Sequence, residues 1–271
     1  MSGNLYLVAT PIGNLEDITL RAIKVLKDVD IIAAEDTRHT LKLLNHLEIK
    51  KPLISYHRHN EEVKTNVLIN RLLEGKNIAL VTDAGTPAIS DPGEEVVKKA
   101  IENDIKIIPI PGACALINAL IVSGFDTKQF SFYGFLPINK KNRKGKFDEL
   151  IKEKNTVILY EAPHKLLNTL KDILKYLGNV NIVLAKEITK IHEDFIRGKI
   201  KEVIDNIESV KGEFIIIIEP IEIEDKCLID ELTIDELYIK YEKQGLEKKE
   251  IIKKIAKDKG VNKNEIYKQF I

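Results

Sequence analysis

The sequence predicts an α/β fold of two domains, followed by a small C-terminal helical domain. Short apolar segments alternate with amphipathic ones up to residue 122, and fewer helices separate the apolar segments after that point. A Lys- and Glu-rich helical pattern begins near residue 232. We therefore expect an N-terminal α/β domain over 1–122, a second α+β domain over 123–222, and a helix-turn-helix-like domain over 228–271.

The N-terminal half alternates apolar strands with helices. The predicted strands cover 5–9, 31–34, 52–55, 78–81 and 107–110. The predicted helices cover 17–27, 40–47, 61–74, 94–103 and 111–122. Asp17 is the expected N-cap of the first helix, and Gly75 is a C-cap candidate for the third. This alternation is typical of a parallel sheet covered on both faces, so polar loops should gather at one edge of the sheet.

The second half is organised differently, after a hinge expected at Ser123-Gly124-Phe125. The predicted strands cover 130–134, 156–160, 182–186, 195–198 and 214–219. The predicted helices cover 147–153, 164–177 and 200–207, and a strongly basic loop is expected over 137–146. Three further helices should cover 234–243, 248–259 and 262–270. Their shared core is expected to consist of Leu246, Ile251, Ile255, Val261 and Ile266.

Composition limits the function classes. The chain has 271 residues, of which 42 are Lys or Arg and 42 are Asp or Glu, so its formal charge is zero. This balance argues against a simple nucleic-acid coat but leaves room for local basic patches. No transmembrane run and no signal-peptide pattern is expected. Cys114 and Cys227 are expected to be buried thiols in a reducing cytoplasm, and no zinc spacing is present.

The segment 78–93 is the strongest local indication of a ligand site. Its strand ends in a loop in which Gly85 permits close approach of a ligand, while Pro87 and Pro92 make the backbone stiff. The loop supplies polar groups from Asp83, Thr86, Ser90 and Asp91. The alternative interpretation is a sharp turn with a helix cap at Asp91. No G-x-G-x-x-G, Walker or G-x-S-x-G motif is present, which disfavours a usual dinucleotide, ATP or hydrolase site.

Several ordered motifs resemble the tetrapyrrole methylase superfamily, in particular its branch acting on ribosomal RNA. The resemblance begins with Val-Ala-Thr-Pro-Ile-Gly-Asn-Leu-Glu-Asp-Ile-Thr at 8–19 and extends over residues 4–220. Further matching motifs lie at 35–38, 82–93, 109–113, 160–164, 185–190 and 211–214. Other branches usually have Gly-Asp-Pro where this chain has Gly85-Thr86-Pro87. Thr86 therefore favours the RNA branch. It also means that the role of the aspartate in the Gly-Asp-Pro motif cannot be transferred directly to Thr86.

The resemblance implies a tetrapyrrole-methylase-like two-domain fold and S-adenosylmethionine as methyl donor, without a metal. It implies transfer of the methyl group to the ribose 2′-hydroxyl of a decoding-region cytidine in 16S ribosomal RNA within the small subunit. A homodimer in the cytoplasm is expected from the family. The alternatives are a precorrin-type tetrapyrrole C-methyltransferase of the same fold and a non-catalytic ribosome-binding module. The basic segments and Thr86 weigh against the first, and the donor-loop motifs weigh against the second.

Site residues follow from the same resemblance. The expected donor-binding residues are Ile12, Asp83, Gly85, Thr86, Ile89, Pro111, Gly112, Ala113, Cys114 and Tyr160. The expected catalytic residues are Glu187, Lys186, Asp36 and Arg38. Glu187 is the candidate proton acceptor, while Lys186 or Arg38 would stabilise a developing alkoxide or hold a phosphate. A salt bridge at a domain interface is the alternative for each.

RNA contacts are expected on two basic segments, since cations neutralise phosphates. The residues concerned are Lys140, Lys141, Arg143, Lys144, Lys146, Lys253 and Lys257. A solvated helix face is the alternative reading of the C-terminal lysines.

Overall fold

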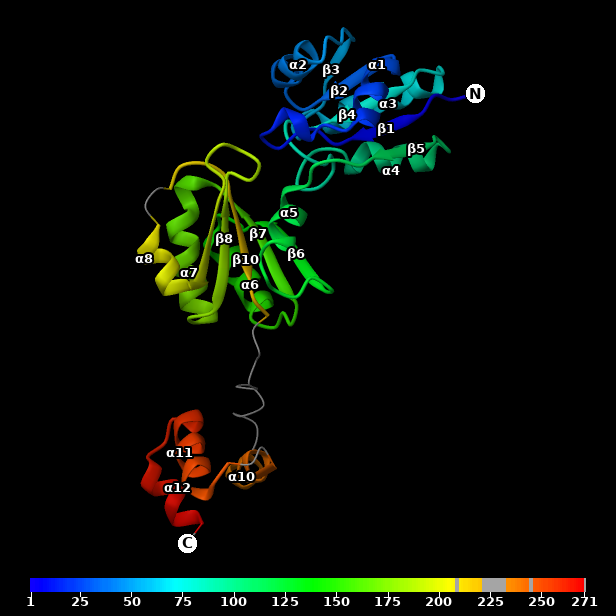
Figure 1. The fold of residues 1–271 in the computed structure, drawn as a ribbon. Helices are drawn as coiled ribbons and strands as arrows, with labels where there is room; N and C mark the ends of the chain where they lie inside the picture. Colours follow the sequence, from blue (N-terminus) through cyan, green and yellow to red (C-terminus); the bar gives the residue numbers. More distant parts are fainter. Residues whose placement is uncertain (208–209, 221–232, 244–245, 271) are drawn as a thin grey trace. The chain divides into compact units, whose positions relative to one another are not determined.

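The computed structural model describes residues 1–207, 210–220, 233–243 and 246–270. The chain divides into two compact units, Met1–Ile221 and Glu222–Ile271 (Figure 1). Cys227 and the predicted boundary between the second and helical domains lie outside the described residues. Among the described helices, none is long and apolar enough to cross a membrane.

The first sheet is entirely parallel, as the alternating pattern predicts. Its strands are β1 (Leu5–Val8), β2 (Ile31–Ala34), β3 (Leu53–Ser55), β4 (Ile78–Val81) and β5 (Ile107–Ile110). They lie in the order β3-β2-β4-β1-β5. All four residues of β4 are buried because helices cover both faces of the sheet. The loops after β1, β2 and β4 therefore meet at the carboxyl edge.

Four helices and a 3-10 turn surround this sheet. They are η1 (Leu15–Asp17), α1 (Leu20–Asp28), α2 (Thr37–His46), α3 (Glu61–Leu73) and α4 (Glu94–Glu102). The apolar cores place α1 and α2 on one face and α3 and α4 on the other. The predicted starts of α1 and α2 were wrong. Thr19 rather than Asp17 caps α1, and α2 begins at Thr37 because the Asp36 carboxylate accepts from the Arg38 N–H. The helix α4 begins at Glu94 as predicted, and because the residue before it is Gly93, the alternative of a helix cap at Asp91 is wrong.

The second sheet is mixed. Its strands are β6 (Phe130–Phe135), β7 (Thr156–Glu161), β8 (Asn181–Lys186), β9 (Asp194–Lys199) and β10 (Phe214–Ile218), in the order β6-β7-β10-β8-β9. The β6–β7 pair is parallel and the other pairs are antiparallel. The apolar side chains of α5 (Ala115–Ile121) pack on one face of this sheet. The other face is covered by α6 (Lys140–Leu150), α7 (Leu166–Leu177), which follows the short turn η2 (Pro163–Lys165), and α8 (Ile200–Asn206).

The predicted basic loop over 137–146 is largely a helix. The side chain of Asn139 accepts hydrogen bonds from the N–H groups of Lys141 and Asn142, which begins α6. Phe147 and Leu150 are buried and anchor the helix from its C-terminal half. The sequence did not predict the first half of this helix, because that half contains lysines and Gly145 and the buried apolar residues occur only in the second half.

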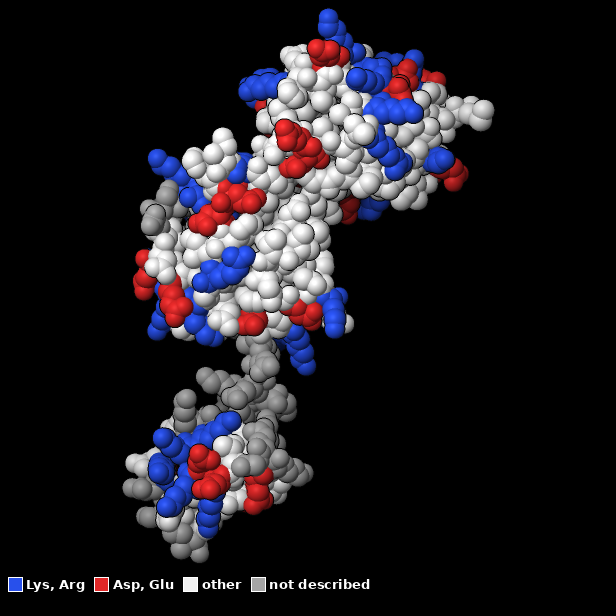
Figure 2. Space-filling view, viewed as in Figure 1, with Lys and Arg blue, Asp and Glu red and all other residues white. Residues whose placement is uncertain are grey.

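The helical unit contains α10 (Ile234–Lys243), α11 (Lys248–Lys259) and α12 (Lys263–Gln269), close to the predicted ranges. Ile251, Ile255 and Ile266 form its core as expected, with Leu246 packed against them. The prediction for Val261 was wrong, because that side chain is 39% exposed. Leu237 and Tyr241 of α10 are buried in this core. Figure 2 shows several lysine side chains on the visible face of this unit, with acidic ones among them.

Candidate functional site

The loops of the first sheet and the ends of β7 and β10 enclose a cavity of about 510 Å³. This volume lies within the usual range for a small-molecule site. The loops after β1, β2 and β4 supply one side, and the start of α5 adds Cys114 and Ala115. Apolar lining comes from Ile12, Ile89, Phe135, Pro163, Ile188 and Ile215. The cavity therefore combines residues distant in sequence, all within the unit Met1–Ile221.

The loop after β4, residues 82–93, forms much of the cavity wall and is called the β4 loop below. Thr10 and Gly85 exchange two backbone hydrogen bonds of 2.9 and 3.1 Å, which join it to the loop after β1. Gly85 has φ +85°, and a Cβ there would lie 3.2 Å from Ile12 Cγ2. Ala88 and Ser90 also have positive φ. Such backbone conformations cost energy in non-glycine residues and persist where the surroundings fix them.

Acidic side chains give the cavity a negative wall. Glu35, Asp83 and Asp91 line it, and Thr82 Oγ1 donates to Glu35 Oε2 at 2.7 Å. Burial, with the nearby charge of Glu35, raises the pKa of Asp91 to about 6. Burial also raises the pKa of Asp83, although the Asp36 N–H donates to its Oδ1 at 3.0 Å. Within the described ranges no lysine or arginine lines the cavity, so it favours a cationic ligand over a phosphate.

The opposite wall is held by Tyr160 of β7. Its hydroxyl oxygen accepts from the Leu116 N–H at 3.2 Å, so it occupies an otherwise unpaired donor near the start of α5. Its ring contacts Phe132 and Phe135 edge-on, with centroids 4.9 and 5.7 Å away. Burial raises the pKa of the Tyr160 hydroxyl, which therefore stays protonated at neutral pH. Thr86 Oγ1 donates to the Ala113 carbonyl at 3.1 Å, which ties the β4 loop to the same segment.

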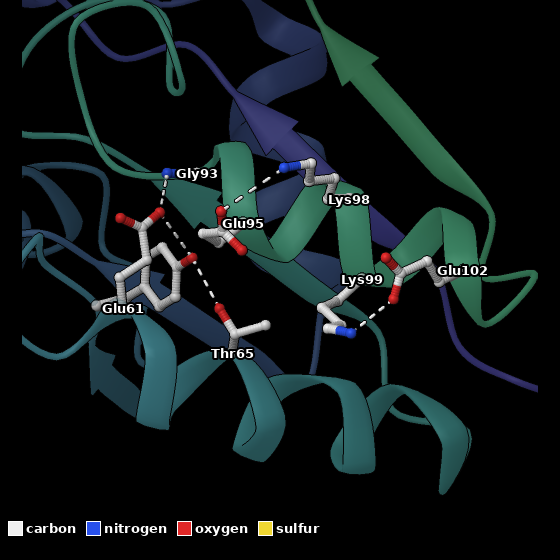
Figure 3. Close-up of polar contacts among 8 residues, drawn as sticks. Glu61, Thr65, Gly93, Glu95, Lys98, Lys99 and Glu102 are labelled. Carbon is white, nitrogen blue, oxygen red and sulfur yellow. Dashed lines mark hydrogen bonds and ion pairs between the residues drawn. The ribbon is translucent and has the colours of Figure 1, made fainter.

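A buried polar network fixes the far end of the β4 loop (Figure 3). Glu61 Oε1, at the start of α3, accepts from the Gly93 N–H at 3.0 Å and from the Tyr56 hydroxyl at 3.0 Å. The Tyr56 oxygen also lies 3.1 Å from Thr65 Oγ1. One carboxylate thus joins α3, the end of β3 and the residue before α4. The ion pairs that α4 forms nearby, Lys98–Glu95 and Lys99–Glu102, are solvent-exposed and contribute little.

Most of the expected donor-binding residues line this cavity. They are Ile12, Asp83, Gly85, Thr86, Ile89, Cys114 and Tyr160. Pro111, Gly112 and Ala113 lie outside its lining, although the Ala113 carbonyl accepts a hydrogen bond from the lining residue Thr86. Glu35, Phe135 and Glu213 line the cavity and were not singled out as donor contacts. Glu35 follows the carboxyl end of β2, which is the signal that would have found it, whereas Glu213 precedes β10 and carries no such signal.

The expected catalytic residues lie in two groups, neither of which lines the cavity. Glu187 follows β8, and its Oε1 accepts from Lys190 Nζ at 3.0 Å and from the Glu213 N–H at 2.7 Å. Burial raises the pKa of Glu187, but these two donors outweigh burial and the net pKa is lowered. Gly212, with φ +99°, permits this contact, since a Cβ there would lie 2.5 Å from Glu187 Cγ. Lys186 is the last residue of β8 and is half-buried.

Asp36 and Arg38 form an ion pair of 2.6 Å at the start of α2. The Arg38 side chain is 88% exposed, so the pair faces solvent. The hydrogen bonds from Arg38 hold the pKa of Asp36 well below its usual range. One hydrogen bond connects this pair to the cavity: the Asp36 backbone N–H donates to Asp83, which lines the cavity.

The expected RNA-binding residues differ in exposure. Lys140, Lys141 and Lys144 of α6 and Lys253 of α11 are exposed. Arg143 is 17% exposed and donates to Asp172 and Thr169 at 2.8 Å each.

Lys146 pairs with Glu149 at 2.6 Å and lies over the Tyr133 ring. The side chain of Lys257 lies outside the described residues. Arg143 and Lys146 thus also bind parts of their own domain. Within the described residues, no group of three or more His, Cys, Asp or Glu side chains is placed to hold a metal.

Comparison with known proteins places the chain among methylases. Residues 4–204 match the family of tetrapyrrole (corrin/porphyrin) methylases. The protein named ribosomal RNA small subunit methyltransferase I is 49% identical in Halalkalibacterium halodurans and 48% in Bacillus subtilis. Each alignment covers 98% of this chain and 93% of the relative.

Solved structures share the fold at low identity. A uroporphyrin-III C-methyl transferase from Thermus thermophilus, complexed with S-adenyl homocysteine, is 18% identical with a TM-score of 0.57. The alignment covers 80% of this chain and 97% of that one. A diphthine synthase is 12% identical with a TM-score of 0.65, over 80% and 90% of the two chains.

Proposed function

We propose that this chain methylates small-subunit ribosomal RNA with S-adenosylmethionine as donor. The premise is that the chain belongs to the tetrapyrrole methylase family and is a methyltransferase. The proposed acceptor is the ribose 2′-hydroxyl of the decoding-region cytidine at position 1402. The cavity with its acidic wall carries this proposal, because it suits a small cationic donor. The relatives at 49% and 48% identity, named for ribosomal RNA, favour an RNA acceptor over a tetrapyrrole.

The cavity residues fit the donor's chemistry. The donor supplies an electrophilic methyl group on a positively charged sulfur, together with an ammonium, a carboxylate and an adenine. Asp83 and Asp91 attract the positive groups, and Ile12 and Ile89 cover apolar surface. Gly85 lets the β4 loop pack closely against Ile12, since a Cβ there would lie 3.2 Å from Ile12 Cγ2.

Asp83 is the proposed acceptor of the 2′-hydroxyl proton. Burial raises its pKa, which makes it a stronger base than an ordinary aspartate. Glu187, the candidate from the sequence pattern, has a lowered pKa and an oxygen occupied by two donors. We assign Glu187 to holding the loop after β8, and we assign Lys186 and Arg38 to phosphate contacts near the acceptor.

RNA contact is proposed for the exposed lysines of both basic segments. Lys140, Lys141 and Lys144 on α6 can bind phosphates without losing internal contacts, and so can Lys253 on α11. Since the main cavity is acidic, the phosphate chain should pass outside it. We also propose that the active form is a homodimer and that it acts in the cytoplasm, where small ribosomal subunits are assembled.

The decisive experiment is nucleoside mass spectrometry of small-subunit RNA from cells with and without this protein. We expect 2′-O-methylcytidine to disappear from the decoding region in its absence and to return with the wild-type gene. An unchanged modification would refute the proposed function. Calorimetry with the donor alone separates an enzyme from a ribosome-binding module, since a module that has no site for the methyl donor should give no heat of donor binding.

A further inference from the structure

A second hollow, of about 220 Å³, lies beside the donor cavity. Thr82 and Asp83 line both spaces, so the two share part of a wall. The hollow lies between the loop after β1, which contributes Thr10 and Leu15, and the first turns of α2. It is less than half the volume of the cavity and below the roughly 300 Å³ of a drug-sized site, so it suits one ring.

One side chain that lines this hollow has a buried polar atom that a ligand could bind. Thr40 of α2 is 3% exposed, and within the described part of the chain its Oγ1 has no hydrogen-bond partner. A helical threonine hydroxyl can bond back to the carbonyl one turn earlier. The Asp36 carbonyl, one turn before Thr40, accepts from the Thr40 backbone N–H at 3.0 Å and receives no bond from the hydroxyl. A buried hydroxyl left unpaired costs about 1–3 kcal/mol, and a ligand bonded to it would recover that loss.

The remaining lining suits the faces and edge of a base. Leu15 and Leu43 offer apolar surface, while His39 and Thr40 offer polar groups. Single-stranded RNA is recognised by bases splayed out of the stack and bonded along their edges. A base held here would place its own ribose next to Asp83, which also borders the donor cavity.

We infer that this hollow binds the base of the target nucleotide, a single pyrimidine of RNA, with Thr40 bonded to its polar edge. The inference rests on the proposed function, whose acceptor is a cytidine, and it adds the site that selects the nucleotide. Thr40 is therefore a specificity residue, since its hydroxyl meets the polar edge of the base, and that edge differs between cytosine and the purines.

Binding is tested directly by NMR on the full chain with labelled threonine methyl groups, saturated with S-adenosylhomocysteine. We expect cytidine 5′-monophosphate to shift the Thr40 methyl signal, assigned through Thr40→Val, and adenosine 5′-monophosphate to leave it unchanged. Absence of a shift with the cytidine nucleotide would overturn the inference. So would a Thr40 shift caused by S-adenosylhomocysteine alone, which would assign the hollow to the donor.

Kinetics give a second, independent test. Thr40→Val keeps the shape and removes a hydroxyl without a partner, so stability should be unchanged or higher and donor affinity should stay within about twofold. The value of kcat/KM for RNA should fall about tenfold, the equivalent of one lost hydrogen bond. Thr65→Val is the matched control for stability, since its hydroxyl is paired with Tyr56 and its loss should destabilise the protein.

The two failures can be told apart. If the wild type leaves small-subunit RNA unmethylated, the proposed function fails, and the NMR titration still decides whether a pyrimidine nucleotide binds at Thr40. If the wild type methylates the RNA and Thr40→Val does so with equal kcat/KM, the inference fails and the proposed function stands.

Discussion

The β4 loop and the loop after β8, residues 187–193, look alike locally and differ in their electrostatics. Each follows a buried strand, begins with or near an acid, and contains non-glycine residues with positive φ: Ala88 and Ser90 in one, Glu187 and Thr189 in the other. The difference comes from their partners.

The acids of the β4 loop, Asp83 and Asp91, face a cavity without lining cations among the described residues, and their pKa values are raised. Glu187 meets Lys190 and the Glu213 N–H, and its pKa is lowered. A strand-end acid is therefore a candidate for chemistry or for structure according to what packs against it, which local sequence does not state.

The sharpest test of this contrast is Asp83→Asn, for which we expect the largest effect. The amide keeps the size of the side chain but cannot take a proton, so the single-turnover methylation rate should fall at least about 100-fold. Glu187→Gln, the matched change in the other loop, should leave that rate within about twofold. If Glu187→Gln had the larger effect, the proton acceptor would lie in the loop after β8.

The backbone of each loop is probed by adding one methyl group. Gly212→Ala places a Cβ 2.5 Å from Glu187 Cγ at φ +99°, so the free energy of unfolding should fall by about 2–3 kcal/mol. Gly85→Ala meets Ile12 at 3.2 Å and should cost about 1 kcal/mol, with weaker donor binding as its main consequence. Urea unfolding and calorimetry measure the two. If Gly85→Ala lost as much stability as Gly212→Ala and still bound the donor normally, Gly85 would have a structural role only.

The pH dependence should have opposite signs in the two loops. Asp91 has a folded pKa of about 6, above its ordinary 3.8, so the folded state binds more protons between these values. Its stabilising contribution is present below pH 3.8 and is lost as the pH rises through 6. Asp91→Asn should therefore be more stable than wild type by about 1 kcal/mol at pH 7, after allowance for solvent screening, and equal to it near pH 3.5.

The ionisation of Asp91 should also make donor affinity depend on pH. A cation next to Asp91 favours the ionised carboxylate, so donor affinity should fall as the pH drops below about 6. Calorimetric titrations at pH 5 and pH 7.5 measure this change, and Asp91→Asn should flatten it. An equally steep pH dependence in Asp91→Asn would assign the effect to another acid of the cavity.

For Glu187 we expect the opposite dependence of stability on pH. Its folded pKa lies below its ordinary 4.5, so its contribution is present above pH 4.5 and is lost as the pH falls through the folded pKa. Glu187→Gln should lower the free energy of unfolding by about 1 kcal/mol at pH 7, and the difference should vanish at low pH. A difference that persisted unchanged at low pH would show that the loss comes from packing and not from the ion pairs.

The sequence by itself determined that the first sheet is parallel, that the second half is mixed, and where most strands lie. These follow from apolar periodicity, which is a local property that burial on one or both faces imposes on the chain. It also identified Gly85, Asp83 and Tyr160 as site residues, and all three line the cavity. Errors concentrated at helix starts such as Thr19 and Asn139, because a single capping side chain sets them.

The tertiary structure alone decided which polar residues meet. It brought Glu35 and Glu213 to the cavity, paired Arg143 with Asp172, and placed the Glu213 N–H against the Glu187 carboxylate. The charge state of an acid depends on atoms a few ångströms away that belong to other segments of the chain. For that reason the motif containing Glu187 could identify the family from sequence, while the chemical role of that carboxylate depends on the folded chain.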